Sequence, residues 1–471
     1  MSSSGVRARA HGRDMRVLAE RTIDLDTQVG ADGASTHDLA GILEAVRTVI
    51  RPIAEDSELH VVALSAAGTA SSVAIAKLKD EFPVAATPIL LWSDTRAART
   101  FPQIAPQLAE AYERTLCPPD ASYWPAKLLY LEEQGALGKD GSIAGSKDLL
   151  FSWLTGQLWT DPMTAGSTGM FGSIDWRWDE ELLSCVHVTS DHLPEVHGAA
   201  EWAPLAKRAA DELGLAAGLP VAVGGMDGVL TQLGSSATRE GIASCTIGTS
   251  IAYREGCSRP VADPRSRTWC YPVTRDFWVI GGAGSNGGNL LTWLRDRLQF
   301  AETIPALVDQ AFAVDPDASL TFLPYLHGER APLWRADLRA AFIGLSAYHS
   351  ARDLARAVLE GIAASLHDLA ETVTSVGGPS RQVVFTGGFL HEKRWVQLMT
   401  DSLGVSSSAP IPDVATSTGA AMVGWAAVEG IPIGDVFEPG QEALAEPDEL
   451  THRRVRATAE RIAHYRGALW P

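Results

Sequence analysis

Two apolar segments near the middle of the chain end in residues suited to chemistry. Residues 221–223 are followed by two glycines and then Asp227, and residues 242–247 are followed by Gly248, Thr249 and Ser250. Each run has the length and β-branched content of a buried strand. One strand end offers a carboxylate, and the other offers backbone N–H groups and hydroxyls that can bind phosphate. Together they predict phosphoryl transfer to a hydroxyl, in a cleft between two halves of the chain.

Length and composition limit the class of protein. A chain of 471 residues is too long for one core and predicts two or three domains, and its 46% hydrophobic and 20% charged residues are an ordinary globular mix. The net charge of -18 disfavours binding nucleic acid or an anionic membrane through bulk charge. The five cysteines include no C-x-x-C pair, so neither a disulfide framework nor a zinc site is supported. Without a signal-peptide core or an apolar run of ~20 residues, the protein is expected to be soluble and cytoplasmic.

Strand-like and helix-like patterns alternate along the chain, which predicts an α/β layered fold. The most regular helical pattern begins at Ser350, where Asp353 completes a capping-box signal. A domain boundary is expected near residues 234–239. The other predicted strands are residues 59–64, 87–92, 277–280 and 383–385, and the other predicted helices are residues 125–134, 146–154, 290–298 and a helix from about residue 394.

Asp227 admits two interpretations. Beside two glycines at a strand's carboxyl end, its side chain could reach a ligand and act as general base for a sugar hydroxyl. A carboxylate suffices for this because the proton leaves late in a loose transition state. The alternative is a helix N-cap, which for this residue taken alone is the more common role.

Glycine-containing turns follow four of the predicted strands, and the first is the Gly224-Gly225 pair before Asp227. Gly248 and Thr249 either bind phosphate oxygens or make a tight hairpin turn, and the turn is commoner in isolation. Residues 281–288 form a glycine-rich loop with Asn286 as a polar side chain, and this loop lacks the G-x-x-x-x-G-K-[ST] pattern of a P-loop. Gly387 and Gly388 follow the fourth strand. Four such turns are less easily coincidental than one.

Two further groups have open interpretations. His327, Glu329 and Arg330 either face a cleft near the nucleotide or form a Glu-Arg pair on a loop surface. Three tryptophans either line a sugar site or pack in the core, which is the default for an isolated Trp. These tryptophans are Trp92, Trp124 and Trp334.

In these segments the chain resembles the FGGY carbohydrate kinases over nearly its whole length. GGMDGVLTQLG followed by SCTIGTS resembles the family's catalytic-Asp segment and second phosphate motif. Three further blocks follow in the expected order, namely WVIGGAGSNGGNLLTWLRD, FLPYLHGERAPLWRADLRAAFIGLS and the TGGF turn. WSDTRA and SKDLLFSWLTGQLWTDPMTAGSTGMF resemble blocks of the N-terminal domain. The C-terminal half is most similar to gluconate kinases, through GMDGVLTQLG, TIGTS, and CYPV followed by FWVIGG.

This resemblance implies an α/β fold of two actin-like ATPase domains, related to ribonuclease H, around a central cleft. Residues 1–236 would hold the sugar and the base, and residues 237–471 would bind the nucleotide. The reaction would be ATP-dependent phosphorylation of a sugar, sugar acid or polyol with Mg²⁺, with a gluconate-like substrate favoured. Asp227 would be the general base and would contact Mg²⁺ through water. The partners would be a small carbohydrate and ATP, not nucleic acid or a membrane, and a homodimer is left open. The nucleotide contacts would be Gly248, Thr249, Asn286, Gly288, Gly387 and Gly388.

Two departures from the family pattern qualify the resemblance. Family members open with a strand and a D-x-G-[TS]-[TS] loop, whereas MSSSGVR starts within that loop, so the first strand and its Asp are expected to be missing through a late start. Many members also place a Met-His or Arg-Glu pair where this chain has Gly68 and Thr69, and CPPDASYWPAKLLY lacks the His-Pro pair of gluconate kinases. The expected substrate contacts are Gly68, Thr69, Asp94, Asp120, Tyr123 and Trp124.

These departures keep other functions open. One alternative is a kinase for a pentulose, hexulose or polyol, and another is a catalytically impaired relative that only binds a sugar. An actin-like filament or chaperone ATPase is disfavoured, because those proteins lack the WSDTRA-type block.

Overall fold

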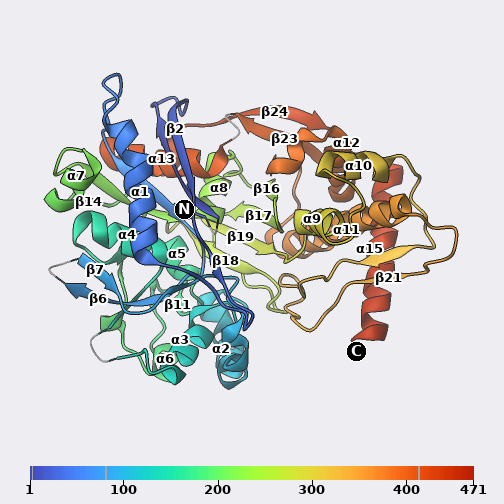
Figure 1. Ribbon diagram of the computed structural model, residues 1–471, viewed down its shortest axis with the longest axis horizontal. Coiled ribbons are helices and arrows are strands. Elements are labelled where there is room, and N and C mark those ends of the chain that lie inside the picture. Colours follow the sequence, from blue (N-terminus) through green and yellow to red (C-terminus); the bar gives the residue numbers. More distant parts are fainter. Residues whose placement is uncertain (3, 80–81, 139–140, 412–413) are drawn as a thin grey trace.

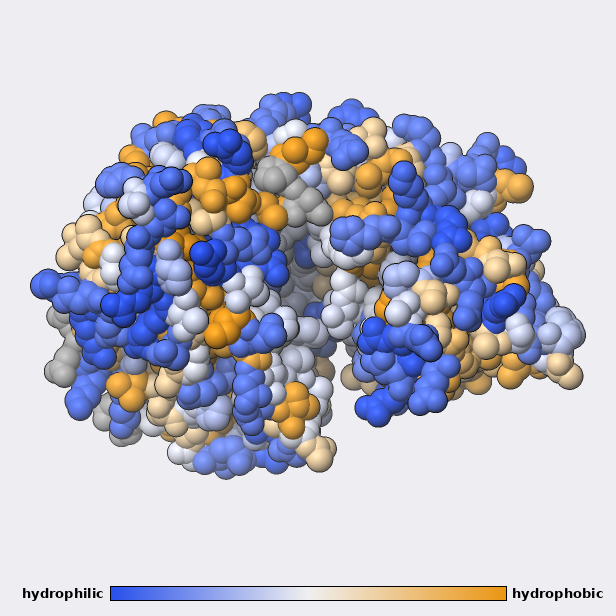
Figure 2. All heavy atoms as spheres, turned by 45° about the horizontal axis from the view of Figure 1, so that its top comes forward, coloured by the Kyte–Doolittle hydropathy of each residue, from blue (hydrophilic) through white to orange (hydrophobic). Residues whose placement is uncertain are grey.

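The computed structural model describes residues 1–2, 4–79, 82–138, 141–411 and 414–471. They form two lobes in Figure 1, one carrying α1 (Leu39–Ala54) to α7 (Lys207–Leu213) and the other α9 (Gly288–Asp296) to α12 (Lys393–Leu403) and α15 (Glu449–Leu469). Figure 2 shows a notch between the two lobes.

The N-terminal half, in which η marks a 3₁₀ helix, ends at α8. Its elements are β1 (Gly5–His11), β2 (Val17–Asp24), β3 (Gln28–Val29), β4 (Ser35–His37), α1, β5 (Leu64–Gly68), β6 (Ala74–Lys79), β7 (Phe82–Ala85), β8 (Ile89–Leu90), η1 (Arg96–Arg99), α2 (Phe101–Thr115), α3 (Trp124–Glu133), β9 (Ser142–Ala144), α4 (Ser146–Thr155), β10 (Trp159–Thr160), α5 (Pro162–Gly166), β11 (Phe171–Gly172), β12 (Arg177–Trp178), α6 (Glu180–Cys185), η2 (Ser190–His192), β13 (Glu195–Val196), β14 (Trp202–Pro204), α7, β15 (Pro220–Met226) and α8 (Asp227–Gly234).

The C-terminal half begins with a strand pair. Its elements are β16 (Ile242–Ile247), β17 (Ile251–Cys257), β18 (Trp269–Pro272), β19 (Trp278–Ala283), α9, α10 (Ile304–Phe312), β20 (Thr321–Leu323), β21 (Ala341–Ile343), α11 (Ala351–Gly377), β22 (Gln382–Thr386), η3 (Gly388–His391), α12, β23 (Ser406–Ile411), α13 (Ala415–Glu429), α14 (Ile433–Val436), β24 (Gly440–Ala445) and α15.

The C-terminal lobe is built on one sheet of seven strands, in the order β18-β19-β17-β16-β22-β23-β24. Strands β16, β22 and β23 run parallel, so the carboxyl ends of β16 and β22 lie at the same edge. Helix α11 packs against β17 and β19 of this sheet. It begins as predicted, because the Ser350 backbone N–H donates to Asp353 at 2.7 Å.

Helix α13 leaves the C-terminal lobe and packs on the N-terminal one, against α8, β15 and β5. In Figure 1 it lies beside α1, away from α12 and α15. The helices α8 and α13 touch backbone to backbone: a methyl group at Gly419 would lie 2.0 Å from the Leu230 carbonyl oxygen, and one at Gly234 would lie 1.9 Å from that of Ala415. Only glycine allows this approach.

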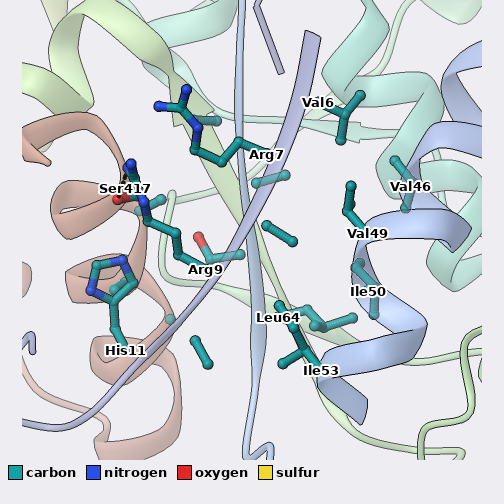
Figure 3. Close-up of a pocket in the computed structure, with 18 of the residues that line it drawn as sticks. Val6, Arg7, Arg9, His11, Val46, Val49, Ile50, Ile53, Leu64 and Ser417 are labelled. Carbon is teal, nitrogen blue, oxygen red and sulfur yellow. Dashed lines mark hydrogen bonds between the residues drawn. The ribbon is translucent and has the colours of Figure 1, made fainter. Parts of the chain in front are cut away.

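A cavity of about 580 Å³ lies between β1 and β5. Within the described part of the chain, β1 pairs only with β2, and β5 pairs only with β15. Figure 3 shows the apolar face of α1 on one side of the cavity and α13, with Ser417, on the other. Its apolar wall from α1 consists of Val46, Val49, Ile50 and Ile53.

The strand predicted at residues 59–64 is wrong for most of its length. Strand β5 begins only at Leu64, and most of its residues are only partly buried. The physical reason is missing pairing: among the described residues β15 pairs with this segment only from Leu64 onward, and residues 59–63 line the cavity instead of joining a ladder. Among the residues placed by the structure, none of the helices combines the length and apolarity that crossing a bilayer requires.

Candidate active site

Asp227 is the first residue of α8, directly after β15. The N-cap position belongs to Met226, and the Asp227 carboxylate accepts a hydrogen bond of 2.6 Å from the neighbouring Gly228 N–H. Burial raises the pKa of this carboxyl group, while the Gly228 N–H, the Arg254 guanidinium and the Met1 amine lower it, and burial prevails. Asp227 is therefore not the N-cap, and its side chain stays available as a proton acceptor.

Three of the predicted turns meet at the carboxyl ends of β16 and β22. The Gly288 N–H donates to the Gly248 carbonyl at 2.9 Å, and the Asn289 N–H donates to the Thr249 carbonyl at 3.1 Å. On the other side, a methyl group at Gly387 would lie 2.2 Å from the Ile247 carbonyl oxygen. The turns after β16, β19 and β22 therefore form one surface.

This surface has open space in front of it. Gly248 and Thr249 are exposed, and a methyl group at Gly248 or Gly388 would meet no atom within 4 Å. Gly387 differs because its φ of +119° and its contact with β16 require glycine. The space beside Gly248 and Gly388 is suited to phosphate oxygens, although the N–H groups of Gly248 and Gly288 themselves donate to the Ser250 and Gly248 carbonyls.

Arg254 of β17 connects the turns to Asp227. Its Nη1 donates to the Thr246 hydroxyl at 3.1 Å, and that hydroxyl lies 2.9 Å from the Thr386 hydroxyl. Its Nη2 would lie 3.2 Å from a methyl group at Gly228. Sequence reasoning did not single out Arg254; the available signal was a cation in the largely apolar strand IAYREGC, next to Glu255.

Glu329 and Asn286 are buried under the glycine-rich loop. The Glu329 carboxylate accepts from the Ser285 N–H, and the Asn286 amide donates to Glu329 at 3.1 Å and to the Gly328 carbonyl at 2.7 Å. The predicted nucleotide contact at Asn286 is therefore corrected, since its amide is used inside the protein. Burial raises the Glu329 pKa to about 7.

A second group of side chains, called the wall, contains residues from both halves. The Arg330 guanidinium lies over the Trp92 ring, 4.5 Å from its centroid, and the Tyr123 hydroxyl lies 3.3 Å from the Tyr271 hydroxyl. Burial lowers the Arg330 pKa, while Glu329 and Asp120 raise it. Because Arg330 and Tyr271 follow the sequence boundary and Trp92 and Tyr123 precede it, this wall spans both lobes. The interpretation of Glu329 and Arg330 as a pair on a loop surface does not hold, because Glu329 is buried and is bonded to Ser285 and Asn286.

The remaining predicted substrate residues lie in two places: Gly68 and Thr69 lie next to Asp227, and Asp94 lies in a buried ion pair. Gly68 pairs with Met226, next to Asp227, and a methyl group there would lie 2.6 Å from Lys147 Cβ. Thr69 follows at the same strand end. Asp94 is 2% exposed and is held by Arg96 at 2.7 Å and by the Ser35 N–H at 3.0 Å.

The Trp124 prediction is corrected. This residue is 1% exposed, its indole N–H donates to the Ser72 carbonyl at 2.9 Å, and its ring stacks on Trp178. A side chain enclosed on all sides cannot contact a substrate in the cleft.

The sequence matches two family models that together span most of the chain. The family model described as "FGGY family of carbohydrate kinases, N-terminal domain" matches residues 2–234, and that of the C-terminal domain matches residues 243–428. The chain belongs to the FGGY family of carbohydrate kinases. Because the match starts at residue 2, it gives no support to the expected truncation of this FGGY kinase.

Similar proteins with three different substrates share its sequence or fold. The gluconokinase of Bacillus subtilis (strain 168) is 33% identical over 362 residues, covering 73% of this FGGY kinase and 71% of the relative. A ligand-bound xylulose kinase from Lactobacillus acidophilus has a TM-score of 0.92 at 24% identity, covering 99% and 96% of the two chains. Plasmodium falciparum glycerol kinase, solved with ADP, has a TM-score of 0.85 at 17% identity, covering 98% and 96%. These structures show that the α/β fold with two domains extends over the full chain.

Proposed function

We propose that this carbohydrate kinase transfers the terminal phosphoryl group of ATP to a hydroxyl of a sugar acid, with gluconate as the favoured substrate. One observation carries the proposal: Arg254 lies next to Gly228, which directly follows Asp227, and it also donates to Thr246, two residues before the turn at Gly248. In this arrangement Asp227 accepts the proton of the attacking hydroxyl. Gly248, Thr249, Gly288, Gly387 and Gly388 surround the nucleotide.

The preference for gluconate rests on the B. subtilis gluconokinase. The wall of Trp92, Tyr123, Tyr271 and Arg330, with Asp120 beside it, offers the partly exposed Arg330 cation to a polar substrate, while the Tyr123 and Tyr271 hydroxyls are buried. Gly68 and Thr69 at the end of β5 would also contact the substrate. A pentulose, hexulose or polyol would use the same wall, and it is the alternative for this site.

Mg²⁺ fits this site only in company with a nucleotide. In the parts of the chain that are described, no three His, Cys, Asp or Glu side chains are grouped as metal ligands. The chain would therefore hold the ion through the ATP phosphates, with Asp227 contacting it through water, and the ion would neutralise phosphate charge.

A coupled ADP-release screen of the purified full chain against sugars, sugar acids and polyols tests the proposal. We expect turnover with gluconate, none with Asp227→Asn, and ADP affinity in that variant within about twofold of wild type, because a base acts on transfer and not on nucleotide binding. Asp211→Asn, in an exposed pair with Lys207, is the control and should keep full activity. Full activity of Asp227→Asn would refute the assigned base, and turnover with a polyol but not with any acid would refute the substrate class.

A further inference from the structure

Arg254 is a buried cation whose donors are mostly unused. It is 8% exposed, and in the structure as described only its Nη1 donates a hydrogen bond, to Thr246. Its Nε is buried without a partner. Buried polar groups almost always have hydrogen-bond partners, so an unpaired donor at a site requires an explanation.

A structural ion pair with Asp227 does not supply that explanation. The structure describes both residues, and their side chains form neither a hydrogen bond nor a direct ion pair, although each shifts the pKa of the other. Burial lowers the Arg254 pKa, and Asp227 raises it. The guanidinium is therefore held near the carboxylate without being neutralised by contact.

The position of Arg254 is set by its strand. It lies opposite Ser244 on β16 and Gly281 on β19, and the Ser244 hydroxyl donates to Gln232 of α8. The same face of the sheet thus points Arg254 toward Gly228, at the start of α8. The Nη1 of the same guanidinium donates to Thr246, which lies two residues before Gly248. Arg254 stands between the proposed base and the proposed phosphate turns.

We propose that Arg254 is a catalytic residue that binds the phosphoryl group in transit; this inference rests on the proposed function. The acceptor oxygen forms a bond to the γ-phosphorus, and the bond between that phosphorus and the β–γ bridging oxygen breaks. The electron pair leaves with ADP, and the acceptor proton passes to Asp227. The free donors of Arg254 point at the equatorial oxygens, where a planar guanidinium suits the geometry and opposes the developing charge.

The test compares Arg254→Met with Arg254→Lys, using ADP and the non-hydrolysable ATP analogue AMP-PNP with Mg²⁺ in calorimetry of the full chain. For Arg254→Met we expect AMP-PNP affinity to fall about 10-fold or more and ADP affinity to stay within about twofold, because only AMP-PNP carries the γ-phosphoryl group. With the sugar found in the screen, kcat should fall about 100-fold or more. Arg254→Lys should recover part of kcat, because it keeps the charge and loses the fork.

Arg356→Met is the matched control, because Arg356 is also 8% exposed but pairs with Glu360 on α11, away from the cleft. It should lower thermal stability and leave the ratio of the two nucleotide affinities unchanged. If Arg254→Met does not fold, Arg254→Lys alone decides, and wild-type kcat in that variant would overturn the proposal.

The outcomes separate the two proposals. A wild-type chain that binds neither nucleotide and phosphorylates no sugar contradicts the proposed function. An active wild type, with Arg254→Met keeping kcat within about threefold, contradicts only the role of Arg254. Loss of affinity for gluconate alone, with polyol turnover and AMP-PNP binding intact, would show that the guanidinium binds a substrate carboxylate, which also overturns the inference.

Discussion

The buried amine of Lys147 donates a hydrogen bond of 3.1 Å to the carbonyl oxygen of Val223, four residues before Asp227. It also lies 3.0 Å from Asp148 and 3.1 Å from Asp161, and all three side chains are enclosed. Burial lowers the Lys147 pKa, but the two carboxylates outweigh it and leave the pKa above its usual value. Lys147 therefore ties strand β15, which ends at Asp227, to α4 and to the start of α5.

Lys147→Met should destabilise the protein by about 3–5 kcal/mol, because it leaves two buried carboxylates without their cation. Urea unfolding measures the loss. Lys207→Met, which breaks an exposed pair with Asp211, should cost at most ~1 kcal/mol. Equal stability of the two variants would show that the buried amine does not hold β15.

Gly387 and Gly388 should respond in opposite ways to substitution. Gly388→Val should leave the melting temperature within a few degrees of wild type but weaken ATP binding about 10-fold or more, because a Cβ at this position meets no protein atom within 4 Å and the side chain enters the proposed nucleotide site. Gly387→Ala should instead lower stability by about 1–3 kcal/mol, because its φ is +119° and β16 is in contact. Calorimetry measures the ATP affinity and thermal melts measure the stability. Unchanged ATP affinity in Gly388→Val would show that the nucleotide does not bind beside Gly388.

The decrease of kcat/KM at acidic pH should follow the protonation of Asp227. Activity should fall as pH drops through its pKa, which burial raises above the ordinary value, because only the ionised base accepts a proton. The charged groups near it are Arg254 and the Met1 amine, and both lower that pKa. Removing the guanidinium in Arg254→Met should therefore move this decrease to higher pH, while Arg356→Met should not. A shift to lower pH would contradict this electrostatic assignment.

Glu329 should make stability depend on pH. Its pKa of about 7 in the folded chain exceeds that of an exposed glutamate, so the folded state binds an extra proton between about pH 4.5 and 7. Stability from this group is therefore greatest at the acidic end and falls by roughly 3 kcal/mol as pH rises through that window. Glu329→Gln should flatten this dependence in urea titrations, and parallel curves for wild type and variant would count against the raised pKa.

Strand β5 should exchange its amide hydrogens faster than β15. Strand β15 is flanked by β14 and β5, whereas β5 borders the cavity of about 580 Å³ on its other side. Peptides covering Leu64–Gly68 should exchange roughly tenfold or more faster than those covering Pro220–Met226 in hydrogen–deuterium exchange. Equal protection would mean that the cavity edge is closed in solution.

Elements whose formation depends on neighbouring residues were predictable from the sequence. Strand β16 was predicted within its observed bounds, and the cap at Ser350 marks the start of α11 as expected. The strand at residues 59–64 failed because pairing depends on what lies beside it, which no local pattern states. Trp124 and Asn286 failed for a related reason, since their residue types do not say whether a side chain faces the core or the cleft.

The candidate site shows the same division. Glycine turns after strands predicted a shared surface, and the turns at Gly248, Gly288 and Gly387 do meet. Arg254 was missed because its importance comes from its closeness to Gly228, which is distant in sequence, and from a donor left unpaired by folding.

The placement of α13 has a consequence for taking this protein apart. The helix lies in the segment matched by the C-terminal family model, yet it covers the sheet of the first lobe. A fragment ending near residue 236 would expose that sheet to water, and the complementary fragment would carry an apolar helix with nothing to cover it. Each half of the sequence thus covers apolar surface of the other, and neither half is expected to fold stably as a separate fragment.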